Sequence, residues 1–199
     1  MTSTINTQRE AIIAASIPFI LEHGWSDKAL SEASLSLDKD SKYWGMFFAN
    51  VSDAVEFFER NEDARMLHVM QNMGPIDGIS NKIGKALYER IVNISGGLAM
   101  LNRLEGFYLG IYAPMVVKSI WRTADVIWIF AGDKATDFNH YSKRTLLSGV
   151  YVAVVRKMLA SGENNIEEYI SDALDKVVKF GNVKKLFKLE NIPILRMFC

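Results

Sequence analysis

Helical periodicity runs through almost the whole chain, and no alternating pattern typical of a β-strand extends beyond a few residues. Apolar residues recur every three or four positions, which is the spacing of one face of an α-helix. Glycine and proline divide this pattern into segments. The sequence therefore predicts an all-α fold. The predicted helices are 8–22, 26–34, 38–48, 52–73, 82–95, 98–108, 114–130, 137–160 and 166–180, with Ser26, Ser52 and Asp137 as N-caps.

The order of helix lengths predicts three parts. Three short helices followed by a long one is the layout of a helix-turn-helix head attached to a helical body. We therefore expect a head over residues 1–65, a body over 66–180 and a tail over 181–199. The 199 residues are 49% apolar and 23% charged, which is typical of a globular protein with a proper core.

The charge of the head argues against nucleic acid as a partner. Residues 1–65 carry six Lys or Arg and eleven Asp or Glu, a net charge of −5. The candidate recognition segment, residues 37–48, has two lysines, two aspartates and no arginine. DNA-binding proteins neutralise phosphates with Lys and Arg. A ligand-sensing transcription regulator therefore remains only as the alternative function.

The last residues have the opposite charge. Residues 176–199 carry six Lys or Arg and one acidic residue, a net charge of +5. An amphipathic helix with a basic border binds the headgroup region of an anionic membrane. The alternative is that this segment packs on the body as a last core helix. The residues predicted to contact a membrane are Lys184, Lys185, Leu186, Phe187 and Lys188.

No run of 18 apolar residues exists, and the first fifteen residues do not read as a targeting signal, which favours a bacterial cytoplasmic protein.

Catalytic and metal-binding motifs are missing from the sequence. The single cysteine, Cys199, excludes an internal disulfide, and the three histidines lack metal-ligand spacing. No phosphate loop, dinucleotide fingerprint or nucleophile motif is present. We expect no metal, no cofactor and no catalysis, so an enzyme acting on a prenylated ring would lack an identifiable catalytic residue.

Aromatic and methionine side chains concentrate on the helices of the body. They either fill a core or line an apolar pocket. Gly96, Gly97, Gly106 and Gly110 favour a pocket, because missing side chains leave room between helices. The residues predicted to bind a lipid are Phe107, Tyr112, Met115, Trp121, Trp128, Leu147, Tyr151 and Val154.

The segment 122–144 joins two apolar helices through a polar loop. Gly132 can end the first helix in a left-handed conformation, and Asp137 can cap the second. The remaining polar and aromatic residues need another explanation. Either Arg122, Asp125 and Arg144 form an internal ion-pair network between the two helices, or the loop is a binding surface for a partner.

This segment resembles the accessory lipid-binding protein of ubiquinone biosynthesis, the ninth of the Coq proteins, a family with the fold of TetR-type repressors. Weaker matches are His23-Gly24-Trp25 in the head and Phe180-Gly181 before the tail. The matching positions of the central motif are Arg122, Thr123, Ala124, Asp125, Ile127, Trp128, Ala131, Gly132, Asp133, Lys134, Thr136, Asp137, Phe138, Asn139, Tyr141, Lys143 and Arg144.

The resemblance implies a non-catalytic protein that holds an isoprenoid quinone intermediate or a phospholipid in an apolar cavity. It implies membrane contact through the C-terminal helix, peripherally at the inner membrane, and presentation of the quinone intermediate to the demethoxyubiquinone hydroxylase. We further expect a homodimer. The implied partner-binding residues are Asp125, Asp137, Asn139, His140 and Tyr141, where His140 replaces the tryptophan usual in the family.

Overall fold

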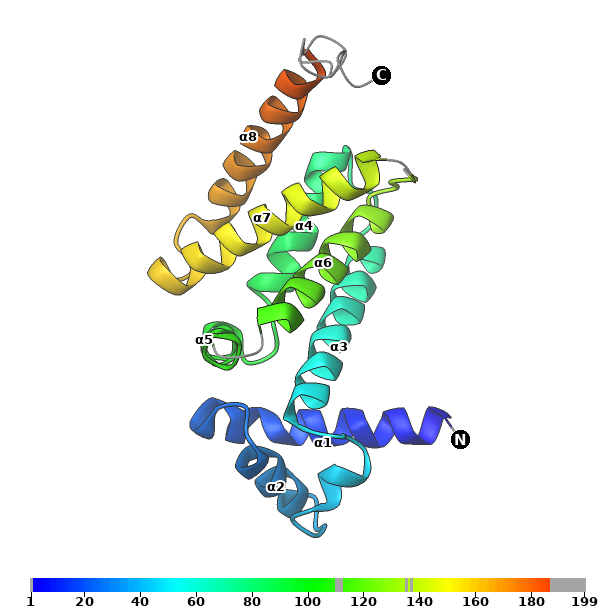
Figure 1. The fold of residues 1–199 in the computed structure, drawn as a ribbon, viewed down its shortest axis with the longest axis vertical. Helices are drawn as coiled ribbons and strands as arrows, with labels where there is room; N and C mark the ends of the chain where they lie inside the picture. Colours follow the sequence, from blue (N-terminus) through cyan, green and yellow to red (C-terminus); the bar gives the residue numbers. More distant parts are fainter. Residues whose placement is uncertain (1, 110–112, 135, 137, 187–199) are drawn as a thin grey trace, which may run out of the picture.

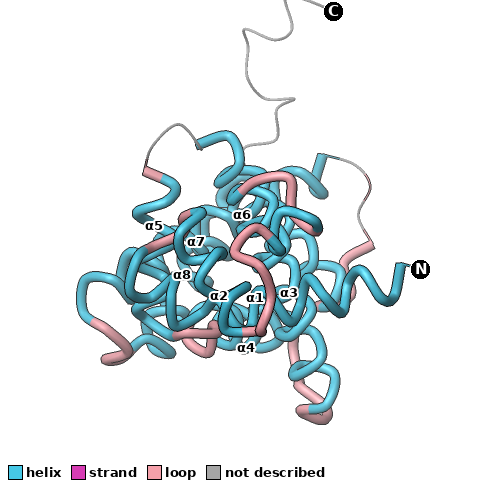
Figure 2. The backbone as a smooth tube through the Cα atoms, turned by 90° about the horizontal axis from the view of Figure 1, so that it is seen from below, coloured by secondary structure: helices cyan, strands magenta, loops and turns pink. Residues whose placement is uncertain are grey.

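The computed structural model describes residues 2–109, 113–134, 136 and 138–186, and it describes side chains for residues 4–109, 114–134, 136 and 139–177. Every element in these ranges is helical, which confirms the predicted all-α fold (Figure 2). The elements are α1 (Thr2–His23), α2 (Asp27–Ser36), the 3-10 helix η1 (Tyr43–Met46), α3 (Val51–Asn72), α4 (Ile79–Ile91), α5 (Gly97–Tyr108), α6 (Ala113–Phe130), α7 (Phe138–Ser161) and α8 (Ile166–Leu186).

The long helix α3 connects the two ends of the molecule. In Figure 1, α1 and α2 lie across the lower end, and α3 rises from them alongside α6. Helices α6 and α7 pack against each other, and α8 leans on α4 and α7. Helix α3 runs unbroken from Val51 to Asn72, so the predicted boundary between head and body at residue 65 falls inside this helix.

Local capping explains where several helices begin and end. Ser26 caps α2 as predicted, since its hydroxyl accepts a hydrogen bond from the Ala29 amide at 3.3 Å. The predicted cap of α3 was wrong by two positions, because Asn50 accepts from the Asp53 amide at 3.0 Å. Gly132 has a φ of +94° and ends α6 in the predicted left-handed manner.

The third predicted helix of the head is much shorter than expected. Residues 37–48 contain only the 3-10 helix η1, which has no charged residue. Asp40 instead accepts a hydrogen bond from the Lys42 amide at 2.8 Å, a turn contact that competes with helix formation. This segment offers no α-helix of the length that enters a DNA major groove.

One apolar cluster runs from the head into the body. Ile12 and Ile20 of α1, Phe58 of α3 and Leu87 of α4 are at most 1% exposed and belong to the same core. Among the described helices, none combines the length and apolar character needed to cross a membrane. The described side chains also contain no group of three His, Cys, Asp or Glu residues arranged to hold a metal ion.

Candidate functional site

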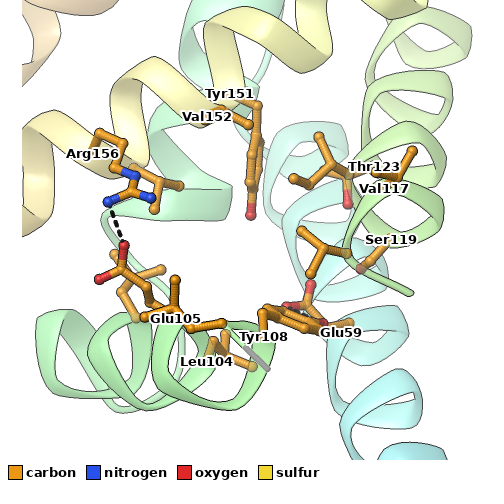
Figure 3. Close-up of a pocket in the computed structure, with 15 residues that line it drawn as sticks. Glu59, Leu104, Glu105, Tyr108, Val117, Ser119, Thr123, Tyr151, Val152 and Arg156 are labelled. Atoms are coloured by element: carbon orange, nitrogen blue, oxygen red, sulfur yellow. Dashed lines mark hydrogen bonds and ion pairs between the residues drawn. The ribbon is translucent and has the colours of Figure 1, made fainter. Parts of the chain in front are cut away.

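A cavity of about 350 Å³ lies between α5, α6 and α7 and reaches α3 (Figure 3). Its walls are mainly aliphatic, and its lining residues include Leu101, Leu104, Val116, Ile120 and Val155. This size is near the lower end of the range found for small-molecule pockets, roughly 300 to 1,000 Å³. The cavity can therefore enclose a ring or a short part of a chain.

The polar groups of the cavity gather on the side of α3 and α6. Glu59, Ser119 and Thr123 line this side, and the phenol of Tyr108 approaches Glu59, with 3.5 Å between its oxygen and Oε1 (Figure 3). The ring of Tyr151 projects from α7 with its hydroxyl directed into the cavity. An apolar space with polar groups at one end is suited to an amphiphilic ligand.

Burial raises the pKa of both phenols. The first cause is desolvation for Tyr108 and for Tyr151, and the nearby Glu59 carboxylate adds to it, because a phenolate would be repelled there. Both hydroxyl groups therefore remain protonated at neutral pH and can donate hydrogen bonds. The polar end of the cavity thus offers neutral donors beside one carboxylate.

The Glu59 carboxylate is balanced by a buried guanidinium. Arg90 of α4 is fully buried and pairs with both Glu59 and Asp63 of α3; its Nε lies 2.8 Å from Asp63 Oδ1. Asp63 also accepts from Arg122 Nε at 2.9 Å and from the Thr123 hydroxyl at 2.8 Å. These bonds satisfy charges that would otherwise be costly to bury, and they join α3, α4 and α6.

Exposed apolar side chains mark the opening of the cavity. Leu109, Val117 and Val152 line it and are 72%, 68% and 43% exposed. At the side away from Glu59, Arg156 Nη1 of α7 lies 2.8 Å from Glu105 Oε1 of α5 (Figure 3). A ligand enclosed here can extend past an apolar rim.

A second polar network fixes the junction of α6 and α7. Arg144 is 2% exposed, and its guanidinium lies 2.7 Å from Asp125 Oδ1 and 2.6 Å from Asp133 Oδ2. Lys143 Nζ lies 2.5 Å from Asp133 Oδ1 and sits over the ring of Trp128. The polar residues of this loop therefore hold the two helices together.

Comparison with known proteins matches the COQ9 family model to residues 113–181, which span α6, α7 and most of α8. Ubiquinone biosynthesis protein COQ9, mitochondrial, of Rattus norvegicus is 23% identical over 189 residues, covering 89% of this chain and 61% of that protein. The Bos taurus protein of the same name is 24% identical over 192 residues, covering 89% and 59%. The chain is similar to proteins of the COQ9 family.

A further COQ9 protein shows the same similarity. The probable ubiquinone biosynthesis protein coq9, mitochondrial, of Dictyostelium discoideum is 25% identical over 196 residues, covering 86% of this chain and 61% of that protein. The chain thus spans about three fifths of the length of the curated COQ9 proteins that it matches.

Of the eight residues predicted to bind a lipid, Tyr151 lines the cavity. Leu147 and Val154 are at most 2% exposed and belong to the core, and Tyr112 lies outside the described residues. Phe107, Met115 and Trp128 pack against that core without lining the cavity. Trp128 donates its indole N–H to the Lys143 carbonyl at 3.1 Å. Trp121 is half-buried beside Tyr141.

The residues predicted to bind a partner divide between the network and the surface. Asp125 is occupied by Arg144, which confirms the expected internal ion pair, whereas Arg122 pairs with Asp63 of α3 instead. Asn139 is exposed and His140 is half-buried. Asp137 lies outside the described residues.

Tyr141 is the most exposed described aromatic residue of this loop. It is 60% exposed, and its ring centre lies 5.2 Å from that of His140 and 6.3 Å from that of Trp121. These three residues, the aromatic patch, come from α6 and α7. The residues predicted to contact a membrane cannot be placed in the same way: the helix α8 includes Lys184, Lys185 and Leu186 without described side chains, and Phe187 and Lys188 lie outside the described residues.

Sequence reasoning missed the buried acids of α3. Glu59, Glu62 and Asp63 are at most 5% exposed, and they follow the same helical face as Phe58 and Met66. Carboxylates in phase with an apolar stripe are a signal for buried ion pairs. The net charge of the head therefore overstates the negative charge of its surface.

Proposed function

We propose that this chain is a non-catalytic accessory protein of ubiquinone biosynthesis that holds an isoprenoid quinone intermediate or another lipid in the cavity between α5, α6 and α7. The observation that carries the proposal is the cavity itself, with aliphatic walls, an exposed apolar rim and polar groups at its inner end. The names of the COQ9 relatives supply the pathway. In this role the protein shields the lipid from water, and the chemistry belongs to a partner.

The proposed partner is the demethoxyubiquinone hydroxylase, met at a membrane surface to which the basic tail brings the carrier. The aromatic patch is the proposed contact, since exposed tyrosine and tryptophan side chains dominate many protein interfaces. A polyprenyl chain exceeds a cavity of about 350 Å³, so part of it would remain at the apolar rim. If the protein covers the ring while the polyprenyl chain stays near the membrane, the free-energy cost of moving the lipid out of the bilayer is lower.

Filling the cavity is expected to remove the bound lipid. Val155 lines the cavity from α7, and a Val155→Trp substitution places an indole in the space that a ligand would use. The measurement is organic extraction of the purified protein followed by mass spectrometry, scored as quinone and phospholipid per protomer. The unchanged chain should carry isoprenoid or phospholipid, and Val155→Trp should carry several-fold less.

Ala160→Trp is the matched control, because Ala160 lies on the same helix and is exposed outside the cavity. Its lipid content should equal that of the unchanged chain. A lipid-free unchanged protein that also fails to bind added lipid would contradict the proposal. Equal lipid in both tryptophan variants would locate the lipid elsewhere.

The Tyr141→Ala variant is expected to bind the hydroxylase at least about tenfold more weakly, because the substitution removes the exposed ring of the aromatic patch. Affinity is measured by biolayer interferometry with the hydroxylase of the same organism. Met46→Ala is the control, since Met46 is 76% exposed on η1, in the head. Unchanged affinity of Tyr141→Ala together with an unchanged thermal transition would refute the assigned contact.

A further inference from the structure

The hydroxyl of Tyr151 faces the cavity and has no hydrogen-bond partner among the described residues. Tyr151 is 8% exposed, and no described residue exchanges a hydrogen bond with its phenol, which is directed into the cavity (Figure 3). Burying a hydroxyl without a partner costs free energy. Water can reach this hydroxyl while the cavity is empty, so a ligand that displaces the water binds best when it supplies an acceptor in its place.

The second feature is the charge balance at the same end of the cavity. Glu59 and Asp63 face Arg90 and Arg122, so two carboxylates meet two guanidinium groups. Arg90 and Arg122 do not line the cavity, whereas Glu59 does. A ligand anion placed here would meet the Glu59 carboxylate at the surface of the cavity. Both nearby cations already form ion pairs and lie behind the cavity wall, although the buried Arg90 Nη1 has no hydrogen-bond partner among the described residues. Such an anion would be desolvated without compensation.

We propose that the polar end of the cavity selects a neutral head group that both donates and accepts a hydrogen bond, such as a phenolic ring, and rejects a carboxylate head. This inference rests on the proposed function, because it assigns the head-group preference of the same lipid site. The hydroxyl of the head accepts from Tyr151 and donates to Glu59. Tyr151 and Glu59 are thus the specificity-determining residues.

The same arrangement sets the orientation of the ligand. A ring bound at Tyr151 and Glu59 lies at the inner end, and its chain runs between the aliphatic walls toward Leu109, Val117 and Val152. A carboxylate lipid would favour the reverse orientation, with its head in water. At the cavity margin the cation Arg156 is 66% exposed and already paired with Glu105. A carboxylate head in that orientation would therefore lack a buried contact that holds it.

The test compares three ligands with the same alkyl chain: a para-alkylphenol, a para-alkylbenzoate and an alkylbenzene. Near pH 8 the phenol is neutral and the benzoate is ionised. Each ligand displaces an environment-sensitive fluorescent lipid from the full chain, at concentrations below micelle formation. The phenol should bind at least about tenfold more tightly than the benzoate, a difference of about 1.4 kcal/mol. Equal affinity, or tighter binding of the benzoate, overturns the inference.

The Tyr151→Phe variant tests the assigned residue. It removes one oxygen that has no partner in the fold, and it should weaken phenol binding by roughly tenfold while leaving alkylbenzene binding unchanged. Tyr169→Phe is the control, because Tyr169 on α8 lies outside this cavity and should leave all three affinities unchanged. Retention of the full phenol preference in Tyr151→Phe overturns the assignment.

The outcomes separate this inference from the proposed function. If none of the three ligands displaces the probe and no lipid is extracted from the purified chain, the proposed function fails. If the ligands bind without a preference for the phenol, the lipid site stands and the head-group assignment fails. A thermal transition recorded for each variant excludes unfolding as the cause of lost binding.

Discussion

An Arg90→Met substitution is expected to lower the free energy of unfolding by about 3 to 5 kcal/mol, which is the usual cost of removing one partner from a buried ion pair. Arg90 is fully buried between Glu59 and Asp63, which are 5% and 4% exposed. Methionine keeps an unbranched side chain of similar reach but leaves the buried carboxylates with less compensating charge. Urea unfolding followed by circular dichroism gives the difference.

The matched control for this experiment is Arg60→Met on α3. The Arg60 side chain is 54% exposed, and its guanidinium lies 2.7 Å from Glu56 Oε1, so water already screens this pair. We expect a loss below about 1 kcal/mol for this exposed pair. A loss in Arg90→Met no larger than in Arg60→Met would show that the buried pairs do not hold α3 and α4 together.

The second large effect is expected at Arg144, where an Arg144→Met substitution should lower the free energy of unfolding by about 2 kcal/mol or more. Arg144 and Asp133 are 2% and 4% exposed as side chains. The effect should be smaller than at Arg90, because Asp125 is 34% exposed and Lys143 still pairs with Asp133. The same urea titration measures it.

A lysine at this position gives a sharper test of geometry. Arg144 uses Nε for Asp125 and Nη1 for Asp133, whereas one ammonium group lacks this fixed fork. Arg144→Lys should therefore recover only part of the lost stability. Lys118→Met serves as the control, since Lys118 is 66% exposed in a surface pair with Glu56. Full recovery by lysine would mean that charge alone, without the fork, stabilises the junction.

The positions of the helices could be predicted because their ends depend on local chemistry. Gly96 and Gly97 take φ values of +86° and +58° at the start of α5, and Gly132 ends α6, so glycines mark both boundaries. The third helix of the head was not predictable in the same way. Residues 37–48 have apolar spacing compatible with a helix, but turn contacts leave only η1.

The cavity was harder to predict, because helical periodicity identifies a buried face without telling whether neighbouring side chains fill the space against it. Val154 and Leu147 of α7 face the core, whereas Tyr151 and Val155 of the same helix reach the cavity. Only the spacing of α5, α6 and α7 decides between these outcomes, and that spacing depends on contacts far apart in sequence. The Arg122 to Asp63 pair is an example, since it joins residues 59 positions apart.

Because the body contains a solvent-open cavity of about 350 Å³, the measured stability of the fold depends on how much ligand occupies that cavity. A molecule that binds the folded chain and not the unfolded one raises the apparent stability by mass action, about 2.7 kcal/mol at a hundredfold excess over its dissociation constant. Residual lipid from the expression host would therefore raise the midpoint of every unfolding curve. Variants of Arg90 and Tyr151 become comparable only at equal lipid content, and the shift on removing lipid is itself a measure of affinity.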